Sequence, residues 1–449
     1  MKFKAKNYGE ILKSPTLPKC TKKWNFYIQF RNLFLLYETI LMYNNCLFVY
    51  MYNQYRCKET LHHAPSPICI ILSMHNNFKS KPPHIYYIGE NIMQQVRTRD
   101  FIYTNDDLYF ASTNYIHPKD RVISFLRYIP DEKGDREKDG KRYRKVGSEE
   151  AYTYLRENHP EYLYFSDVTN VEMMGVPLDK VERIIKPDQR LLGLKETFDN
   201  GGEVKNPKLI SKLMDVADFF HFKADIPYDH LGISGSILPG LQKSDVSDLD
   251  FVVYGLDNHR RAIEAFKKYR GEEVHIEEIG KTIKVDGITG DYWDFVYDKR
   301  MFDESLTKEE FRWYENRKAN RGTINGTLFD ILATKDYSEI EGEWGDTVYE
   351  PQGVEKIEAD IISALGAYDN PSLYTIENVR HLDGVDYPPT EIVSFTHTYA
   401  GEVVDGEHVI AKGKVEKVII NGKPSHYRLV VGTTREAIDE YLKLKETPA

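Results

Sequence analysis

The spacing of apolar residues predicts a succession of helices and strands. From residue 207 to residue 222 apolar side chains recur at helical intervals, which predicts an amphipathic helix. The apolar run that follows Asp248 and ends at Gly255 is typical of a buried strand, and so is the run at 327–334. Between these two runs, residues 258–269 predict a further helix.

The regions on either side of this segment have different patterns. Residues 97–197 mix strand-like runs, a charged hairpin and a helix that starts at Ser148, a candidate N-cap. From residue 349 onward, short alternating runs lie between Gly and Pro turns, and residues 434–446 predict a closing helix. These patterns predict an α+β protein with an N-terminal α+β module (97–197), a core (205–340) and a small β-barrel-like module (349–445).

The first 92 residues differ in composition from the rest. They contain twelve Lys and Arg, four acidic residues and all four cysteines, so the remaining chain has a net charge of −18. The apolar run 39–52 is shorter than the ~20 residues of a membrane-spanning helix, and Asn44 and Asn45 interrupt it. We favour the hypothesis that residues 1–92 are an atypical extension, either disordered or not native coding sequence. A membrane anchor and a genuine accessory segment are the alternatives.

Overall charge and cysteine content narrow the class of protein. With a net charge of −10, the chain lacks the basic character typical of nucleic-acid-binding proteins, although a local basic groove remains open. Cysteine is absent after residue 92, so disulfides play no part in the main body. We therefore expect a cytoplasmic protein that does not contact the membrane unless residues 1–92 anchor it.

The strongest candidate for chemistry is Gly235-Ser236, followed after eleven residues by Asp248-Leu249-Asp250. Alternate residues of a strand point to the same side, so Asp248 and Asp250 are predicted to project together. Two such carboxylates repel each other unless a cation lies between them, and Mg²⁺ is an ion that prefers oxygen ligands. The Gly-Ser turn offers N–H groups and a hydroxyl to an anion. The pattern predicts a site for a metal-bound triphosphate; the alternative is a surface turn whose aspartates cap a loop.

This pattern resembles the signature of the nucleotidyltransferase superfamily, which has the polymerase-beta-like fold. In that signature an apolar residue and Gly-Gly or Gly-Ser precede Asp-apolar-Asp by roughly a dozen residues. Here Ile233 is the apolar residue, and Ser234 is an extra small residue. The three-module arrangement is also similar to that of predicted archaeal-type nucleotidyltransferases. The resemblance implies a mixed-sheet core in which Asp248 and Asp250 bind one or two Mg²⁺ ions and Gly235 and Ser236 position a nucleoside triphosphate.

The resemblance also implies a third carboxylate on a later strand of the same sheet. Asp330 is the first choice because it lies within the apolar run 327–334, where a charge must be paired, protonated or bound to metal. Asp294 is the second choice, and its alternative is a position on a surface hairpin. Asp330 would complete the second metal site and could accept a proton from the attacking hydroxyl.

Basic residues near these acids are candidates for phosphate contacts. A helix predicted from Ser305 to about Arg321 ends in a basic loop, in which Arg317 and Arg321 could hold a triphosphate. The alternative is a solvated helix end, where cations are favoured by the helix dipole. The run 141–145 (KRYRK) suits phosphate or RNA contact, but we favour a solvated hairpin flank for it.

Together these features predict a magnesium-dependent enzyme. It would transfer a nucleoside monophosphate from a nucleoside triphosphate to RNA, a protein or a small molecule, and release pyrophosphate. The alternative is a catalytically silent protein that binds a nucleotide or RNA with the same fold. The sequence does not identify the nucleotide, the acceptor or the oligomeric state.

Overall fold

The computed structural model describes residues 96–243, 247–433 and 437–446, together with three earlier strands. The chain divides into two compact units, Met1–Tyr86 and Tyr87–Ala449. In the first unit, β1 (Leu36–Tyr43), β2 (Cys46–Asn53) and β3 (Ile70–Ser73) form an antiparallel sheet, so the apolar run 39–52 forms two paired strands. The other residues of the segment 1–92, to which our hypothesis of an atypical extension applies, lie outside the described residues.

The second unit begins with a sheet that α1 (Ser148–Asn158) covers. Its strands are hydrogen-bonded in the order β11-β4-β5-β6-β10-β9, and the hairpin β7–β8 joins through β6. Gly147 is the N-cap of α1, so Ser148 is the first residue of this helix and the predicted cap was wrong by one position. The strands are β4 (Phe101–Thr104), β5 (Tyr109–Ser112), β6 (Arg121–Pro130), β7 (Arg136–Lys138), β8 (Lys141–Lys145), β9 (Leu163–Ser166), β10 (Val171–Pro177) and β11 (Val181–Ile185).

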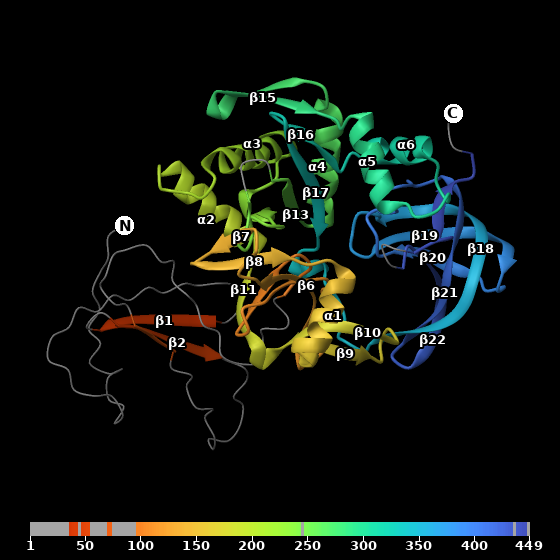
Figure 1. Ribbon diagram of the computed structural model, residues 1–449, viewed down its shortest axis with the longest axis horizontal. Helices are drawn as coiled ribbons and strands as arrows, with labels where there is room; N and C mark the ends of the chain where they lie inside the picture. Colours follow the sequence, from red (N-terminus) through yellow and green to blue (C-terminus); the bar gives the residue numbers. More distant parts are fainter. Residues whose placement is uncertain are drawn as a thin grey trace, which may run out of the picture. The chain divides into compact units, whose positions relative to one another are not determined.

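A second, mixed sheet forms the core of the unit (Figure 1). Its order is β12-β13-β17-β16-β15-β14, and β13 and β17 are parallel neighbours. Helices α2, α3 and α4 bury their apolar sides against it, as the helical period of residues 207–222 predicts. The elements are α2 (Pro187–Asp199), α3 (Pro207–Ala224), β12 (Leu231–Ile233), β13 (Leu249–Tyr254), α4 (Leu256–Tyr269), β14 (Glu273–Ile276), β15 (Lys281–Asp286), β16 (Arg321–Ile324) and β17 (Thr327–Thr334).

The C-terminal strands close into a barrel. They pair in the order β18-β19-β20-β22-β21, and β21 pairs with β18 again, which closes the ring; β23 adds to β21. The helix predicted at 434–446 was wrong for Tyr441–Leu444, which forms β23 and pairs with β21; residues 434–436 lie outside the described residues. The strands are β18 (Thr347–Gly366), β19 (Ser372–Gly384), β20 (Pro389–Ser394), β21 (His408–Ile420), β22 (Lys423–Val431) and β23 (Tyr441–Leu444).

Two helices between β15 and β16 pack against this barrel rather than against the core sheet. Trp293 of α5 (Gly290–Arg300) and Phe311 of α6 (Lys308–Lys318) belong to the apolar cluster of the barrel. Helix α6 starts with a capping box of Thr307 and Glu310, not at the predicted Ser305. No helix in the described part of the chain is long and apolar enough to span a membrane.

Candidate active site

The turn after β12 presses Gly235 against Asp250. Gly235 has a φ of +59°, in the left-handed region that glycine adopts without strain. A Cβ at this position would collide with a carboxylate oxygen of Asp250, so a larger residue would displace that side chain. The backbone N–H of Ser234 donates to the carbonyl oxygen of Asp250 at 2.9 Å. The Gly-Ser turn is therefore built directly against the Asp-Leu-Asp strand.

Three acidic residues lie close together at two inner strands of the core sheet, β13 and β17. Asp250 lies directly opposite Asp330 in the parallel register of β13 and β17, and Asp248 immediately precedes β13. The strand contexts predicted for Asp250 and Asp330 are those observed. The sheet thus brings together residues that are 80 positions apart in the sequence.

The electrostatics of Asp248 and Asp250 are unfavourable in the protein alone. Burial, followed by repulsion from Asp330, raises the pKa of both carboxyls, that of Asp250 to about 6. Neither carboxylate forms an ion pair with any residue in the described part of the chain. A cation bound to both would oppose these effects. The two residues are therefore suited to hold one.

Asp330 already has a cationic partner. Arg321 donates to its carboxylate from Nε and, at 2.6 Å, from Nη2. Burial lowers the pKa of Arg321, but attraction to Asp330 outweighs burial and raises it above its usual range. Arg321 is therefore the counter-ion of Asp330.

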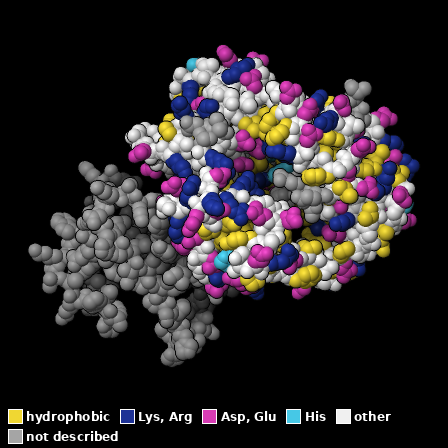
Figure 2. All heavy atoms as spheres, viewed as in Figure 1, with side chains coloured by type: hydrophobic (Ala, Val, Ile, Leu, Met, Phe, Trp, Pro, Cys, Tyr) yellow, Lys and Arg dark blue, Asp and Glu magenta, His cyan; other side chains and the backbone are white. Residues whose placement is uncertain are grey.

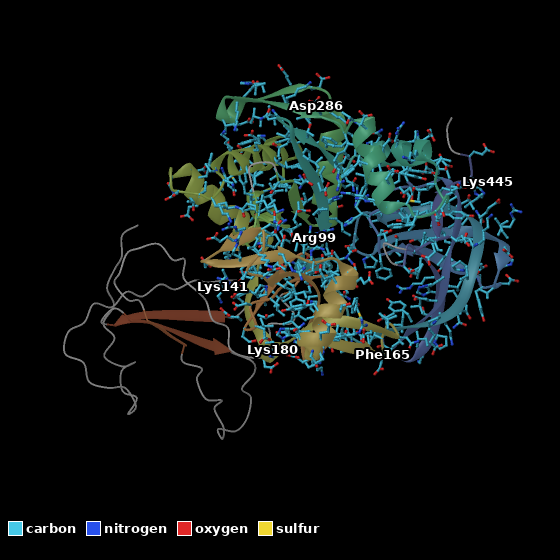
Figure 3. All side chains as sticks on the ribbon, in the orientation of Figure 1. Arg99, Lys141, Phe165, Lys180, Asp286 and Lys445 are labelled. Carbon is cyan, nitrogen blue, oxygen red and sulfur yellow. The ribbon has the colours of Figure 1, made fainter. Side chains whose placement is uncertain are left out.

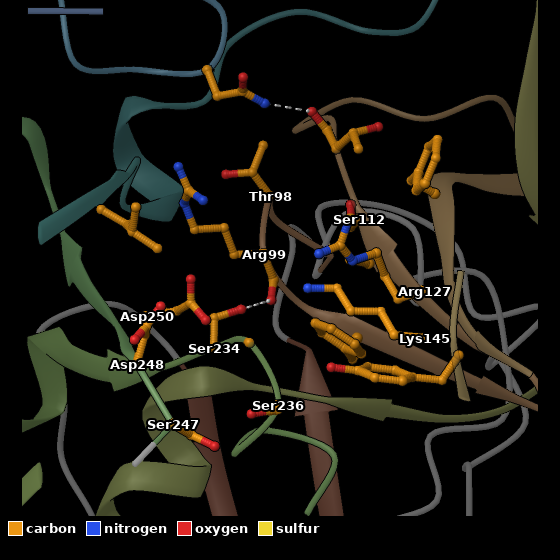
Figure 4. A pocket seen from close by; sticks show the side chains of 18 of the residues that line it. Thr98, Arg99, Ser112, Arg127, Lys145, Ser234, Ser236, Ser247, Asp248 and Asp250 are labelled. Atoms are coloured by element: carbon orange, nitrogen blue, oxygen red, sulfur yellow. Dashed lines mark hydrogen bonds between the residues drawn. The ribbon is translucent and has the colours of Figure 1, made fainter. Parts of the chain in front are cut away.

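A cavity of about 540 Å³ opens in front of Asp248 and Asp250. Figure 4 shows Arg127 and Lys145 pointing into it from the wall opposite the two carboxylates, with the guanidinium of Arg99 above Asp250. Ser234, Gly235 and Ser236 line the same cavity. In the space-filling view, Lys and Arg side chains border a hollow in this part of the surface (Figure 2). One wall is thus acidic and the facing wall is basic.

The cations of the basic wall come from the N-terminal sheet. Arg127 lies on β6 and Lys145 on β8, where Lys145 is the register partner of Tyr128. Arg99 lies between this sheet and the core sheet (Figure 3), and its Nε donates to the carbonyl oxygen of Ala333 at 3.3 Å. The site therefore needs the N-terminal sheet as well as the core.

Arg97 anchors the segment that carries Arg99. Its guanidinium lies between the rings of Tyr254 and Tyr337, 3.9 and 4.0 Å from their centroids. It also pairs with Asp188 at 3.4 Å and with Asp336 at 3.6 Å, while its side chain is only 3% exposed. This set of contacts fixes the residues before β4 onto the ends of β13 and β17.

An aromatic cluster joins the N-terminal sheet to the turn that follows Ser236. Leu238 and Leu241 of this turn are buried against four aromatic residues of the sheet, Phe101, Tyr109, Tyr128 and Tyr143. One end of the turn therefore carries Gly235 and Ser236, and the other end contacts the N-terminal sheet. Packing on this cluster sets the distance between the acidic and the basic wall.

The loop before β19 links the barrel to the other two sheets beside the cavity. Tyr115 of the N-terminal sheet region donates to Asp369 at 2.6 Å, and Lys335, just after β17, pairs with the same carboxylate at 3.2 Å. Asn370 lines the cavity and donates to the carbonyl oxygen of Thr113 at 3.3 Å. Loops of the barrel thus contribute to the walls of the cavity, together with the other two sheets.

The structure does not bring two of the candidate residues to this site. Arg317 pairs with Glu407 at 2.6 Å and lies over the ring of Trp313, away from the cavity lining. Asp294 is on α5, where Arg312 holds its carboxylate, and not on a hairpin, so that structural expectation was wrong. Asp330, rather than Asp294, is the acid that lies beside Asp250.

Sequence reasoning missed Arg99 and Arg127 and underrated Lys145. Lys145 is in the run 141–145, for which a phosphate contact was the less favoured interpretation. The rest of that run matches the favoured one: Lys141 pairs with Asp107 and Arg144 with Asp131. The alternation of side chains along the strand could have indicated Lys145. Residues 141, 143 and 145 share one face of β8, and Tyr143 is buried in the aromatic cluster.

Two other groups of potential metal ligands lie outside the cavity. Among the described residues, the ligand atoms of Asp106, His159 and Glu161 lie within 4.8 Å of one another, and so do those of Glu355, His381 and Asp386. In the first group, Lys180 already pairs with both acids at 3.0 and 3.2 Å. In the second, His381 pairs with Glu355 at 2.8 Å. Side chains of the protein thus balance charge in both groups.

The chain is similar in sequence to an archaeal protein. It is 40% identical over 362 residues to a protein of Methanocaldococcus jannaschii named "Uncharacterized protein MJ1086". The alignment covers 78% of this chain and 99% of that protein. The chain belongs to the MJ1086 family. No family model matches the chain, and no solved structure does. Because the alignment spans nearly all of MJ1086, the family relationship extends well beyond the Asp-Leu-Asp motif.

Proposed function

We propose that this protein is a metal-dependent nucleotidyltransferase. It would move a nucleoside monophosphate from a nucleoside triphosphate to an acceptor hydroxyl and release pyrophosphate. The observation that supports this most is the cavity itself, in which Asp248 and Asp250 face Arg127 and Lys145. The acidic wall is suited to a cation and the basic wall to an anion, and a metal-bound triphosphate supplies both. A volume of about 540 Å³ is in the usual range for a pocket that holds one such ligand.

The acidic wall fits a hard divalent ion such as Mg²⁺. Asp248 and Asp250 offer carboxylate oxygens and form no ion pair with a described side chain; cations nearby, such as Lys145, lower their pKa less than burial and Asp330 raise it. A bound ion would supply neutralising charge to the phosphates during transfer. Asp330 would complete a second metal site, and Arg321 holds this carboxylate beside Asp250. Burial and Asp330 together still disfavour the charged form of both carboxylates, and a bound cation would offset this.

The basic wall and the Gly-Ser turn would orient the triphosphate. Ser236 offers a hydroxyl, and the left-handed turn at Gly235 presents backbone N–H groups, the kind of donors that bind phosphate oxygens. Arg127 and Lys145 would take the remaining phosphate charge from the opposite side. In this proposal they replace Arg317, which lies away from the cavity.

The proposed reaction is an attack of the acceptor hydroxyl on the α-phosphate of the bound triphosphate. The acceptor oxygen forms a bond to the α-phosphorus, the bond from that phosphorus to the oxygen bridging to the β-phosphate breaks, and pyrophosphate leaves with the electron pair. The hydroxyl proton passes to a carboxylate of the site, for which Asp330 is our candidate. Asp248 and Asp250 would hold the cation, and its positive charge would favour their ionised form.

The test is to incubate the protein with Mg²⁺ and each α-labelled nucleoside triphosphate in the presence of total RNA or lysate protein. We expect one fraction to become labelled and Asp248→Asn to abolish the labelling while leaving the unfolding transition intact. Transfer that survives in Asp248→Asn would end the proposed mechanism. Because Arg321 already balances Asp330, a silent nucleotide- or RNA-binding protein is the second candidate; it predicts binding of triphosphate without any labelled product.

A further inference from the structure

One face of the β7–β8 hairpin carries cations beside the active-site cavity. Arg136 is the register partner of Tyr143 and Lys138 that of Lys141, so these four side chains project from the same face. Tyr143 packs on the turn 236–241, and Arg136 donates to the carbonyl oxygen of Leu241 at 2.6 Å. Figure 2 shows Lys and Arg side chains gathered over this hairpin.

Three cations converge on Gly240 at the end of that turn. An Nη atom of Arg190 and the side chain of Lys138 each lie 3.9 Å from the position that a Cβ of Gly240 would take. Lys205 donates to the carbonyl oxygens of Gly240 and Glu137, at 3.1 and 2.9 Å. Arg190 donates to the carbonyl oxygen of Ile237 at 3.2 Å. Cationic side chains from strand β7, helix α2 and the loop before α3 therefore meet at Gly240.

Carboxylates of the described residues offset the positive charge of this group only in part. None of Lys138, Arg190 and Lys205 forms an ion pair with a carboxylate of the described residues, although Asp139 attracts Lys138 and Glu137 attracts Lys205. The hydrogen bonds of Arg190 and Lys205 go to backbone carbonyls. Burial lowers the pKa of Lys138 to about 8, and repulsion by Arg183, Arg190 and Lys205 adds to this effect. Burial likewise lowers the pKa of Arg190 and Lys205. An anion bound between them would relieve both repulsion and desolvation.

We propose that Lys138, Arg190 and Lys205 form a second anion site, which binds a phosphate group of the acceptor. The identity of this ligand as the acceptor rests on the proposed nucleotidyl transfer. Arg136 connects the two sites, because it lines the cavity and also lies close enough to repel Lys205. Lys145, Arg136 and Lys138 thus form a continuous basic track from the cavity to Gly240. Such a track suits an acceptor with phosphate beside its reactive hydroxyl, as in a nucleic-acid strand.

The test reads each lysine separately. The full-length protein is treated with acetic anhydride at pH 8 in EDTA, and acetylation is measured by mass spectrometry with and without added ligand. The ligands are a single-stranded oligoribonucleotide and inorganic pyrophosphate. We expect ligand to protect Lys138 and Lys205 but not Lys141, which lies on the same hairpin and pairs with Asp107 at 2.7 Å (Figure 3). Protection by the oligoribonucleotide alone identifies a strand as the source of the phosphate; protection by both identifies any phosphorylated acceptor.

Binding by variants gives the second measurement. We expect Lys138→Gln and Arg190→Gln each to weaken binding of the protecting ligand by at least about tenfold, and Lys141→Gln to leave it unchanged. Protection should persist in Asp248→Asn, so a failure of the anion site is distinguishable from a failure of metal-dependent transfer. Equal labelling of Lys138 with and without either ligand, or equal affinity of all three variants and the wild-type protein, would overturn the proposal.

Discussion

Replacing Asp250 by Asn should stabilise the fold while abolishing transfer. The pKa of this carboxyl is raised, first by burial and then by Asp330, from 3.8 to about 6. A shift of about two pKa units corresponds to ~3 kcal/mol at 1.36 kcal/mol per unit. Because the folded-state pKa is the higher one, the ionised carboxylate destabilises the fold above pH 6, and this penalty disappears as the pH falls through 3.8. Asn keeps the shape of the side chain without the charge.

The assay is urea unfolding in EDTA at pH 8 and at pH 4. At pH 8 we expect Asp250→Asn to be more stable than the wild-type protein by up to about 3 kcal/mol, and at pH 4 by little. Added Mg²⁺ should stabilise the wild-type protein and not the variant. Asp167→Asn is the matched control, since Asp167 is an exposed acid outside the cavity. A variant that is less stable than the wild-type protein at pH 8 without metal would refute the electrostatic reasoning.

Other substitutions, and removal of metal, should change stability or triphosphate binding in different ways. Asp330→Asn should lower the free energy of unfolding by ~2 kcal/mol, because Arg321 loses its half-buried charged partner, and urea unfolding would show no loss if the pair were weak. Gly235→Ala should cost ~1–3 kcal/mol from its positive φ and prevent binding of triphosphate, which calorimetry would detect. Arg97→Met should cost ~2 kcal/mol, and retention of full stability would contradict its role as anchor. Lys145→Gln should weaken triphosphate binding by about tenfold and leave stability unchanged. EDTA should lower the melting temperature of protein saturated with Mg²⁺, and an equal melting temperature would mean that the ion does not bind the folded state.

The spacing of apolar residues predicted much of the core, because it reflects which side chains are buried. The period of residues 207–222 became α3, and the apolar runs around Asp250 and Asp330 became the two parallel strands β13 and β17. The alternating runs after residue 349 became a closed ring of strands. In each case the residues that face the core repeat at the period of the element that carries them.

The rest depended on contacts between distant segments. Residues 434–446 have a helical pattern, but pairing with β21 makes Tyr441–Leu444 a strand. The alternative for Asp294 was a surface hairpin, whereas the segment is helical and Phe295 is exposed. Arg99 and Arg127 reach the cavity only because a separate sheet packs on the turn after Ser236. No short-range pattern in the sequence reports such packing.

The basic wall changes which part of the chain is expected to control substrate binding. Arg127 and Lys145 belong to the N-terminal sheet, whose position depends on Leu238, Leu241 and the anchor at Arg97. A change in this packing would move the cations relative to Asp248 without altering any residue that touches the ligand. Substitutions at Leu238 or Leu241 are therefore expected to weaken triphosphate binding through geometry.

A nucleotide labelled at both ends of its triphosphate tests nucleotidyl transfer at Asp248 and Asp250. The protein is incubated with Mg²⁺, a cellular acceptor fraction and a nucleoside triphosphate that carries different labels on its α- and γ-phosphates. We expect the α-label to enter the acceptor, the γ-label to leave in pyrophosphate in equal amount, and both events to stop in Asp248→Asn. Transfer of the γ-label to the acceptor, or equal release in the variant, would contradict nucleotidyl transfer at these carboxylates.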